Sequence, residues 1–181
     1  MNNDYMQADS KNKGVISTII EKLGVLDRMI NGHMAVQHKP FPLACRVYNN
    51  ANISIVNGGV GTLLTFNTEQ RDDGGLHSTT LNTGRLTAPV DGWYQISGCV
   101  FWTANATGIR YLQININTVP IATVTMPGSA VAGANYQVIS TLYYMTSGQY
   151  AELLGYQDSG GALNITVSDV KSPSFEMALI K

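Results

Sequence analysis

The chain has 181 residues, a formal net charge of −1 and a charged fraction of 13%, against a usual share of about 25%. Because it has no run of Lys or Arg, it lacks the electrostatic footprint of a protein that binds nucleic acid or an anionic membrane. No stretch approaches the roughly 18 apolar residues of a membrane span, and the polar N-terminus has no apolar segment of signal-peptide length. We therefore expect a protein made in a reducing cytoplasm, without a cleaved signal, in which Cys45 and Cys99 are buried thiols.

Residues 1–14 are a polar tail without periodicity, which we expect to attach the chain to another protein. Residues 15–34 predict a short helix whose apolar residues recur at spacings of 3, 4, 3 and 4, typical of a coiled coil. Ile at both kinds of seam position favours three strands, but so short a helix does not associate alone. An amphipathic helix packed on its own domain is the alternative. The predicted seam is Ile16, Ile19, Leu23, Leu26 and Ile30.

Residues 35–43 predict a stiff, extended linker, because Pro40 and Pro42 disfavour a helix. From residue 44 to residue 181, short apolar runs alternate with Gly-rich and Asp-rich turns. About ten short strands with no helical period between them predict an all-β domain, a β-sandwich. The expected strands are 44–48, 52–56, 61–67, 85–88, 93–103, 109–117, 119–126, 135–146, 149–156, 162–168 and 174–180.

The strand expected at 135–146 is apolar on both faces. One face carries Tyr136, Val138, Leu142 and Tyr144, and the other carries Ile139, Tyr143 and Met145. An antiparallel strand of this kind needs a cover for its outer face, and another subunit is the economical candidate. We expect the face with Ile139, Tyr143 and Met145 to form the subunit interface.

Residues 84–96, GRLTAPVDGWYQI, combine a sharp turn with an alternating strand. The turn residues Pro89 and Gly92 redirect the chain, so that Tyr94 and Ile96 point into the sandwich while Trp93 and Gln95 face outward. In the closing strand 174–180, Phe175, Met177 and Leu179 share one face.

These segments resemble the globular head of the C1q/TNF-like family, whose signature is Gly-x-Phe-Thr-Ala-Pro-x-x-Gly-x-Tyr-x-Phe. Leu86 and Ile96 stand where that family has Phe, which keeps the positions apolar. The resemblance covers about residues 44–181 and implies a ten-stranded jelly roll that assembles as a tight homotrimer, commonly at the end of a trimeric stalk. The positions that carry it are Gly84, Pro89, Gly92, Tyr94, Ile96 and Phe175.

No catalytic constellation stands out in the sequence. His33, His38 and His77 are scattered without metal-ligand spacing, and no serine lies in a nucleophile elbow. The acidic turn residues Asp72, Asp73 and Asp158 are better explained by hairpin chemistry than by calcium binding. We expect neither enzymatic activity nor a cofactor or metal ion.

Function must then come from assembly and display. A trimeric C1q-like head on a short stalk, with a polar tail and no signal peptide, indicates a phage virion protein. In this interpretation residues 1–14 bind another virion protein, and the head, on the virion surface, binds a host-surface glycan or protein. The sequence leaves two alternatives open, a capsid decoration protein that covers the shell and a bacterial surface or spore-coat adhesin.

Overall fold

The computed structural model describes residues 13–27, 29, 43–169 and 171–180. The chain divides into two compact units, Met1–Phe41 and Pro42–Lys181, each of which is described by itself below. The predicted tail, linker and last seam residue, Ile30, fall largely or wholly outside the described residues.

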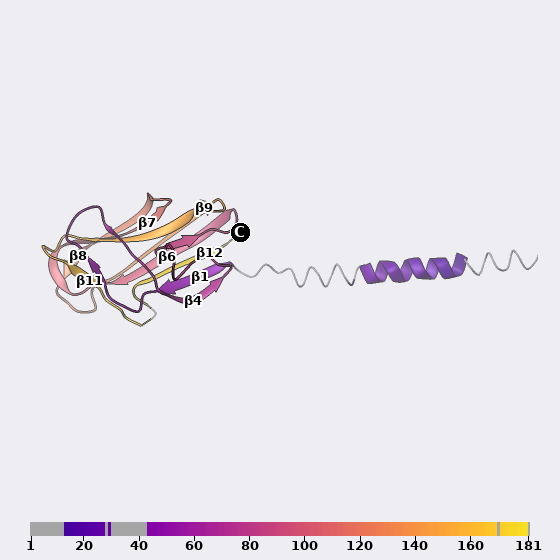
Figure 1. Cartoon of the computed structure of the whole chain (residues 1–181), viewed down its shortest axis with the longest axis horizontal. Coiled ribbons are helices and arrows are strands. Elements are labelled where there is room, and N and C mark those ends of the chain that lie inside the picture. The colour runs from indigo at the N-terminus through magenta and orange to yellow at the C-terminus, as the bar shows by residue number, and fades with distance from the viewer. Residues whose placement is uncertain (1–12, 28, 30–42, 170, 181) are drawn as a thin grey trace, which may run out of the picture. The chain divides into compact units, whose positions relative to one another are not determined.

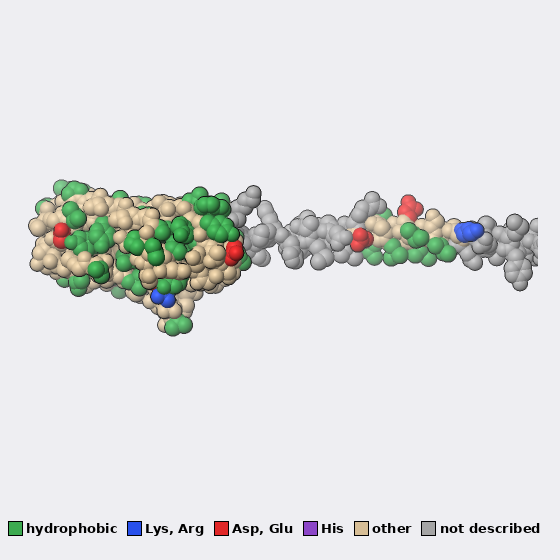
Figure 2. Space-filling model, turned by 90° about the horizontal axis from the view of Figure 1, so that it is seen from above, with side chains coloured by type: hydrophobic (Ala, Val, Ile, Leu, Met, Phe, Trp, Pro, Cys, Tyr) green, Lys and Arg blue, Asp and Glu red, His purple; other side chains and the backbone are tan. Residues whose placement is uncertain are grey.

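The N-terminal unit contains a helix at residues 13–27, which begins two residues before the predicted start. The predicted seam residues Ile16, Ile19, Leu23 and Leu26 are each at least 50% exposed in the single chain. Figure 2 shows hydrophobic side chains along one side of this helix and acidic side chains on another. No helix among the described residues is both long and apolar enough to cross a membrane. The coiled coil itself stays a prediction.

The C-terminal unit, here called the head, is built from strands that form two five-stranded sheets and one small pair (Figure 1). Sheet I has the order β4-β1-β12-β6-β9. Sheet II has the order β3-β10-β7-β8, with β5 also paired to β10, and β2 pairs with β11. The strands are β1 (Ala44–Tyr48), β2 (Ile53–Ile55), β3 (Thr62–Leu63), β4 (Thr68–Asp73), β5 (Arg85–Thr87), β6 (Gly92–Phe101), β7 (Asn105–Ile116), β8 (Val119–Ser129), β9 (Tyr136–Met145), β10 (Tyr150–Gln157), β11 (Leu163–Ile165) and β12 (Ser174–Leu179).

The predicted β-sandwich is confirmed, but the described residues contain twelve strands rather than about ten. The strand that sequence reasoning missed is β4, at the edge of sheet I, where it pairs with β1. Its sequence, TEQRDD, is polar and rich in residues with low strand propensity. Charged residues are nevertheless common on edge strands, because they discourage pairing with another chain.

The core lies between the two sheets. Leu112, Ile114 and Leu153 from sheet II and Ile96 and Phe175 from sheet I are all fully buried in it. The two sheets approach closely at Gly98, where an added Cβ would lie 2.6 Å from a Leu153 methyl carbon. This packing fixes which face of each strand points outward.

A buried polar network crosses the core at one end. The Trp102 indole donates to the Gln137 side chain at 3.0 Å, and the Gln137 amide donates to the Val124 carbonyl at 2.8 Å. Arg110 is 1% exposed and donates to the carbonyls of Thr107 and Ile109. Burial lowers the pKa of its guanidinium. Because these partners are side chains and backbone carbonyls of the chain itself, the network ties β7, β8 and β9 together.

The turn at residues 88–92 is held by a set of hydrogen bonds that explains the signature. The buried Tyr94 donates its hydroxyl proton to the Val90 carbonyl at 2.8 Å, closing the turn onto the strand that follows. Ser147 donates its amide to Asp91 Oδ1 and its hydroxyl to the Pro89 carbonyl, at 2.7 and 2.9 Å. At the start of the signature, a Cβ on Gly84 would lie 2.7 Å from the Leu64 carbonyl oxygen, so the close approach of these two segments requires glycine.

Candidate assembly surface

The face of β9 that the sequence analysis assigned to a subunit interface points into the core of the head. Ile139 and Met145 are buried in the core, at 6% and 0% exposure, and Tyr143 packs against it. The expectation that these three form the interface is wrong for Ile139 and Met145, because the β9 face packed on sheet II is the one that carries them. The residues that point outward are Tyr136, Val138, Leu142 and Tyr144.

The outward side chains of β9 lie beside those of β6, its antiparallel neighbour. Trp93 is opposite Tyr144, and their rings meet edge to face with centroids 5.7 Å apart. At the other end Phe101 is opposite Tyr136, and these rings stack at 4.4 Å. Aromatic pairs across neighbouring strands stabilise a sheet. We call the five exposed residues of this surface the apolar band: Trp93, Tyr136, Val138, Leu142 and Tyr144.

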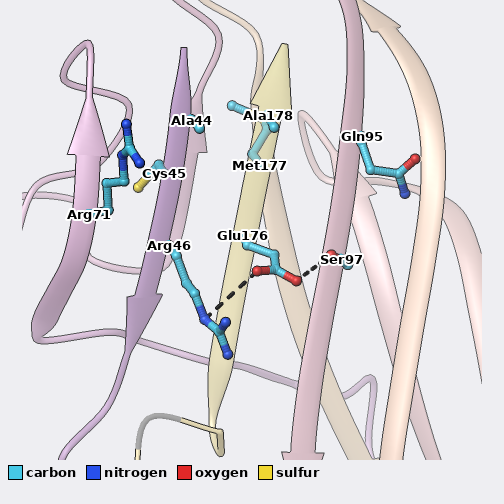
Figure 3. Close-up of a pocket in the computed structure, with 9 residues that line it drawn as sticks. All are labelled: Ala44, Cys45, Arg46, Arg71, Gln95, Ser97, Glu176, Met177 and Ala178. Carbon is cyan, nitrogen blue, oxygen red and sulfur yellow. Dashed lines mark hydrogen bonds and ion pairs between the residues drawn. The ribbon is translucent and has the colours of Figure 1, made fainter. Parts of the chain in front are cut away.

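A hollow of about 230 Å³ lies on the same outward face of sheet I, over β1, β12 and β6 (Figure 3). Glu176 stands between Arg46 and Ser97 in it. The Arg46 Nε to Glu176 Oε2 distance is 3.8 Å, and the Ser97 hydroxyl donates to Glu176 Oε1 at 2.8 Å. The hollow therefore combines apolar side chains with this fixed polar group and with the side chains of Arg71 and Gln95. Its lining residues are Ala44, Cys45, Arg46, Arg71, Gln95, Ser97, Glu176, Met177 and Ala178.

The hollow was not foreseen from the sequence, because its residues come from four strands that are distant along the chain. The sequence contained one sign of the hollow, the alternation of polar and apolar residues within the first and last strand segments. Arg46 in residues 44–48 and Glu176 in residues 174–180 are polar residues between inward apolar ones, and the two are register partners. The antiparallel pairing of β1 with β12 in sheet I brings them together.

Both cysteines lie in sheet I and are free thiols. Cys45 is 3% exposed, and burial raises its pKa well above the usual range, with the nearby Asp72 carboxylate acting in the same direction. Cys99 is half-buried on the outward face, opposite Val138, and burial raises its pKa as well. Both thiols are therefore poor nucleophiles at neutral pH.

The other residues considered as catalytic or metal-binding candidates are held in hydrogen bonds and ion pairs within the head. Asp72 accepts hydrogen bonds from the amides of Leu76 and His77, and Asp158 accepts one from the amide of Ile109. Asp73 is paired with Arg71. The buried imidazole of His77 contacts Glu69 and the Thr83 carbonyl, whereas His33 and His38 lie outside the described residues. Within the described part of the chain, no group of three or more His, Cys, Asp or Glu residues is arranged to hold a metal ion.

No protein-family model matches the chain, and no curated protein matches it in sequence. Solved structures do match in three dimensions. The structure of Eiger TNF from S. frugiperda superimposes with a TM-score of 0.54 and 8% identity, over 77% of this chain and 93% of that one. The crystal structure of murine APRIL at pH 5.0 superimposes with a TM-score of 0.55 and 7% identity, over 77% of this chain and 100% of that one. The head has a TNF-type jelly-roll fold.

At this level of identity the similarity establishes the fold and nothing further. What this jelly roll does must be argued from its own surface. Sheet I carries both the apolar band and the hollow on its outward face.

Proposed function

We propose that the chain is a structural, non-enzymatic protein whose heads assemble into a homotrimer through the outward face of sheet I, and which displays those heads on a short helical stalk. The apolar band carries the proposal. Its five residues are each between 42% and 62% exposed in the single chain, and they lie together on two neighbouring strands. Ser140 separates Tyr136 and Val138 from Leu142, Tyr144 and Trp93 on this face. Exposed apolar groups gathered on one face in this way often mark a protein interface.

Sheet I offers the two different patches that a ring of three copies needs. Around a threefold axis each copy contacts its neighbours through two distinct surfaces, unlike a twofold dimer, which uses one surface twice. The apolar band lies at the β9 edge of the sheet, and the hollow lies over β1, β12 and β6. Projecting side chains of the band on one copy can fill the hollow of the next. The Arg46–Glu176–Ser97 group would then fix the register of the contact.

The helix at 13–27 fits the same assembly. Its apolar residues are exposed along one side, and three such helices brought together would bury them against each other. A seam this short associates only when something else holds the chains near one another, and the heads provide that proximity. The trimer that the C1q/TNF-like resemblance implies has this division between stalk and head.

A virion is the setting we propose for this trimer, as a short fibre or spike anchored by residues 1–14. The support is compositional: a charged fraction of only 13% and a polar N-terminal segment. A trimer of heads would bind a repetitive host surface with avidity, even where each single contact is weak.

Two experiments test the assembly and the anchor separately. Sedimentation equilibrium of the full chain is expected to give three times 19.5 kDa, and the isolated unit 42–181 is expected to give a trimer as well. A stable monomer at micromolar concentration would refute the proposal. A variant lacking residues 1–12 keeps the described helix, so it is expected to stay trimeric while no longer joining virions. Incorporation of that variant at the level of the full chain would refute the anchor.

A further inference from the structure

A second hollow, of about 270 Å³, lies at the β3–β5 edge of sheet II, the sheet on the other side of the core. It is formed where the loop between β4 and β5 passes beside β3. Four of its seven lining residues carry a hydroxyl or amide side chain. The residues that matter are Leu63, Thr65, Thr80, Asn82, Thr83 and Arg85.

The loop that forms this hollow is held in place by its own hydrogen bonds. The buried imidazole of His77 contacts Glu69 at 2.9 Å and the Thr83 carbonyl at 3.2 Å. The amide of Phe66 also donates to the Thr83 carbonyl, at 2.9 Å. Asn82 turns the chain with a φ of 54°, a conformation that asparagine tolerates better than most residues. The walls of the hollow are thus fixed before any ligand arrives.

Several polar groups of the lining have no partner within the described chain. The side chains of Thr65, Asn82 and Thr83 form no hydrogen bond with any described residue. Together they offer two hydroxyl groups and one amide, and each of these both donates and accepts. A ligand rich in hydroxyl groups satisfies donors and acceptors of this mixed kind, whereas an apolar ligand leaves them unpaired.

Arg85 adds a guanidinium group that is held in place and whose positive charge is balanced by a neighbouring carboxylate. Its Nε donates to Glu152 Oε1 at 2.9 Å, and its guanidinium carbon lies 3.9 Å from the centre of the Tyr150 ring. Glu152 is buried, so its charge stays beside Arg85. Because the two charges cancel locally, the hollow favours a neutral ligand over a free anion. The remaining guanidinium N–H groups still donate to oxygen.

We propose that this hollow binds one sugar ring of a neutral saccharide. Its volume lies just below the range of about 300–1,000 Å³ typical of sites for drug-sized ligands, a size that suits a single ring. Leu63, 39% exposed, supplies apolar surface for the C–H groups of the ring. The site belongs to sheet II, so assembly through sheet I leaves it open. This assignment deepens the recognition role of the proposed function and rests on that function for its biological setting, but the site is complete in one copy.

The test is a ligand-observed NMR titration of the full chain with four probes, the methyl glycosides of glucose, galactose, mannose and N-acetylglucosamine. At least one probe is expected to show saturable binding. Asn82→Gly removes the amide while keeping the backbone conformation, and Thr83→Val removes one hydroxyl with little change of shape. Each is expected to weaken that binding about fivefold or more, the cost of one or two lost hydrogen bonds. Thr125→Val, on the exposed part of β8 away from the hollow, is the matched control and is expected to leave binding unchanged.

The proposal is overturned if no probe binds saturably, if both variants bind as the unsubstituted chain does, or if sodium sulfate competes while the glycosides do not bind. Sedimentation of the same samples separates this result from the proposed assembly. A trimer that binds no glycoside contradicts only the saccharide site. A monomer that binds a glycoside contradicts only the assembly.

Discussion

Replacing Leu142 with Asp is the sharpest perturbation of the proposed interface. Leu142 lies in the middle of β9, points outward and is 51% exposed in the single chain. Its register partner is Gln95, so the substitution breaks no contact in the hydrophobic core. The fold of the head is therefore expected to survive, while the apolar band gains a charge at its centre.

The magnitude follows from the exposed fraction. Burying a whole leucine side chain contributes about 1.5–3 kcal/mol, so covering the exposed half of Leu142 contributes about 1 kcal/mol per copy. Three copies give about 3 kcal/mol per trimer, so Leu142→Ala should raise the trimer dissociation constant by about 100-fold. Aspartate adds the cost of burying an unpaired carboxylate, several kcal/mol in each interface. The Asp variant is therefore expected to be monomeric at micromolar concentration.

Sedimentation velocity measures the outcome directly, and circular dichroism with thermal unfolding checks that the head is still folded. Leu81→Asp is the matched control, because Leu81 is 70% exposed in the loop between β4 and β5, away from the apolar band. It is expected to remain trimeric. If Leu142→Asp is folded and still trimeric with an unchanged dissociation constant, the band is not the interface.

Three further predictions concern single side chains. Tyr94→Phe removes the hydroxyl that donates to the Val90 carbonyl and should lower the free energy of unfolding, measured in urea, by about 1 kcal/mol. The oligomeric state should not change. An unaltered unfolding midpoint would mean that this hydrogen bond does not hold the turn. Cys45 should react slowly with iodoacetamide at pH 8, because its raised pKa leaves little thiolate and it is buried. Cys99 should react slowly in the trimer and faster in monomeric Leu142→Asp, since it lies opposite Val138 on the proposed interface; equal rates by mass spectrometry would contradict this.

The sequence was sufficient to predict the sandwich and most of its strands, because alternation of apolar residues reports directly on one buried face. Sequence reasoning assigned the wrong face of β9, because alternation cannot identify the buried face of a strand that is apolar on both faces. Val138 and Ile139 are both strongly apolar, so a period of two gave no sign of which one points inward. Only the packing of β9 against the other sheet distinguishes them, and there Ile139 is 6% exposed and Val138 is 62% exposed.

Sites assembled from distant segments were the second limit. The hollow on sheet II combines Leu63 with residues 80–85, and Arg85 in it depends on Glu152, which is 67 residues further along the chain. No local pattern marks such a group, and threonine and asparagine in a loop read simply as turn chemistry. The strand pairing of β5 with β10, where Arg85 and Glu152 are register partners, is what brings them together.

The two outward faces of the sandwich differ in a way that bears on how assembly and recognition coexist. On sheet II the Gln113 amide donates to Asn115 at 2.7 Å, and the Thr123 hydroxyl donates to Gln113 at 3.3 Å, so neighbouring polar side chains satisfy one another. Such a face is stable in water and gains little from being covered, because a partner would have to replace bonds that already exist. On sheet I the hydrocarbon side chains of Val138 and Leu142 in the apolar band have no such bonds to lose, and covering them releases water from apolar surface. Association should therefore cover sheet I and leave sheet II in solvent, which is the face where a trimeric head would meet a ligand.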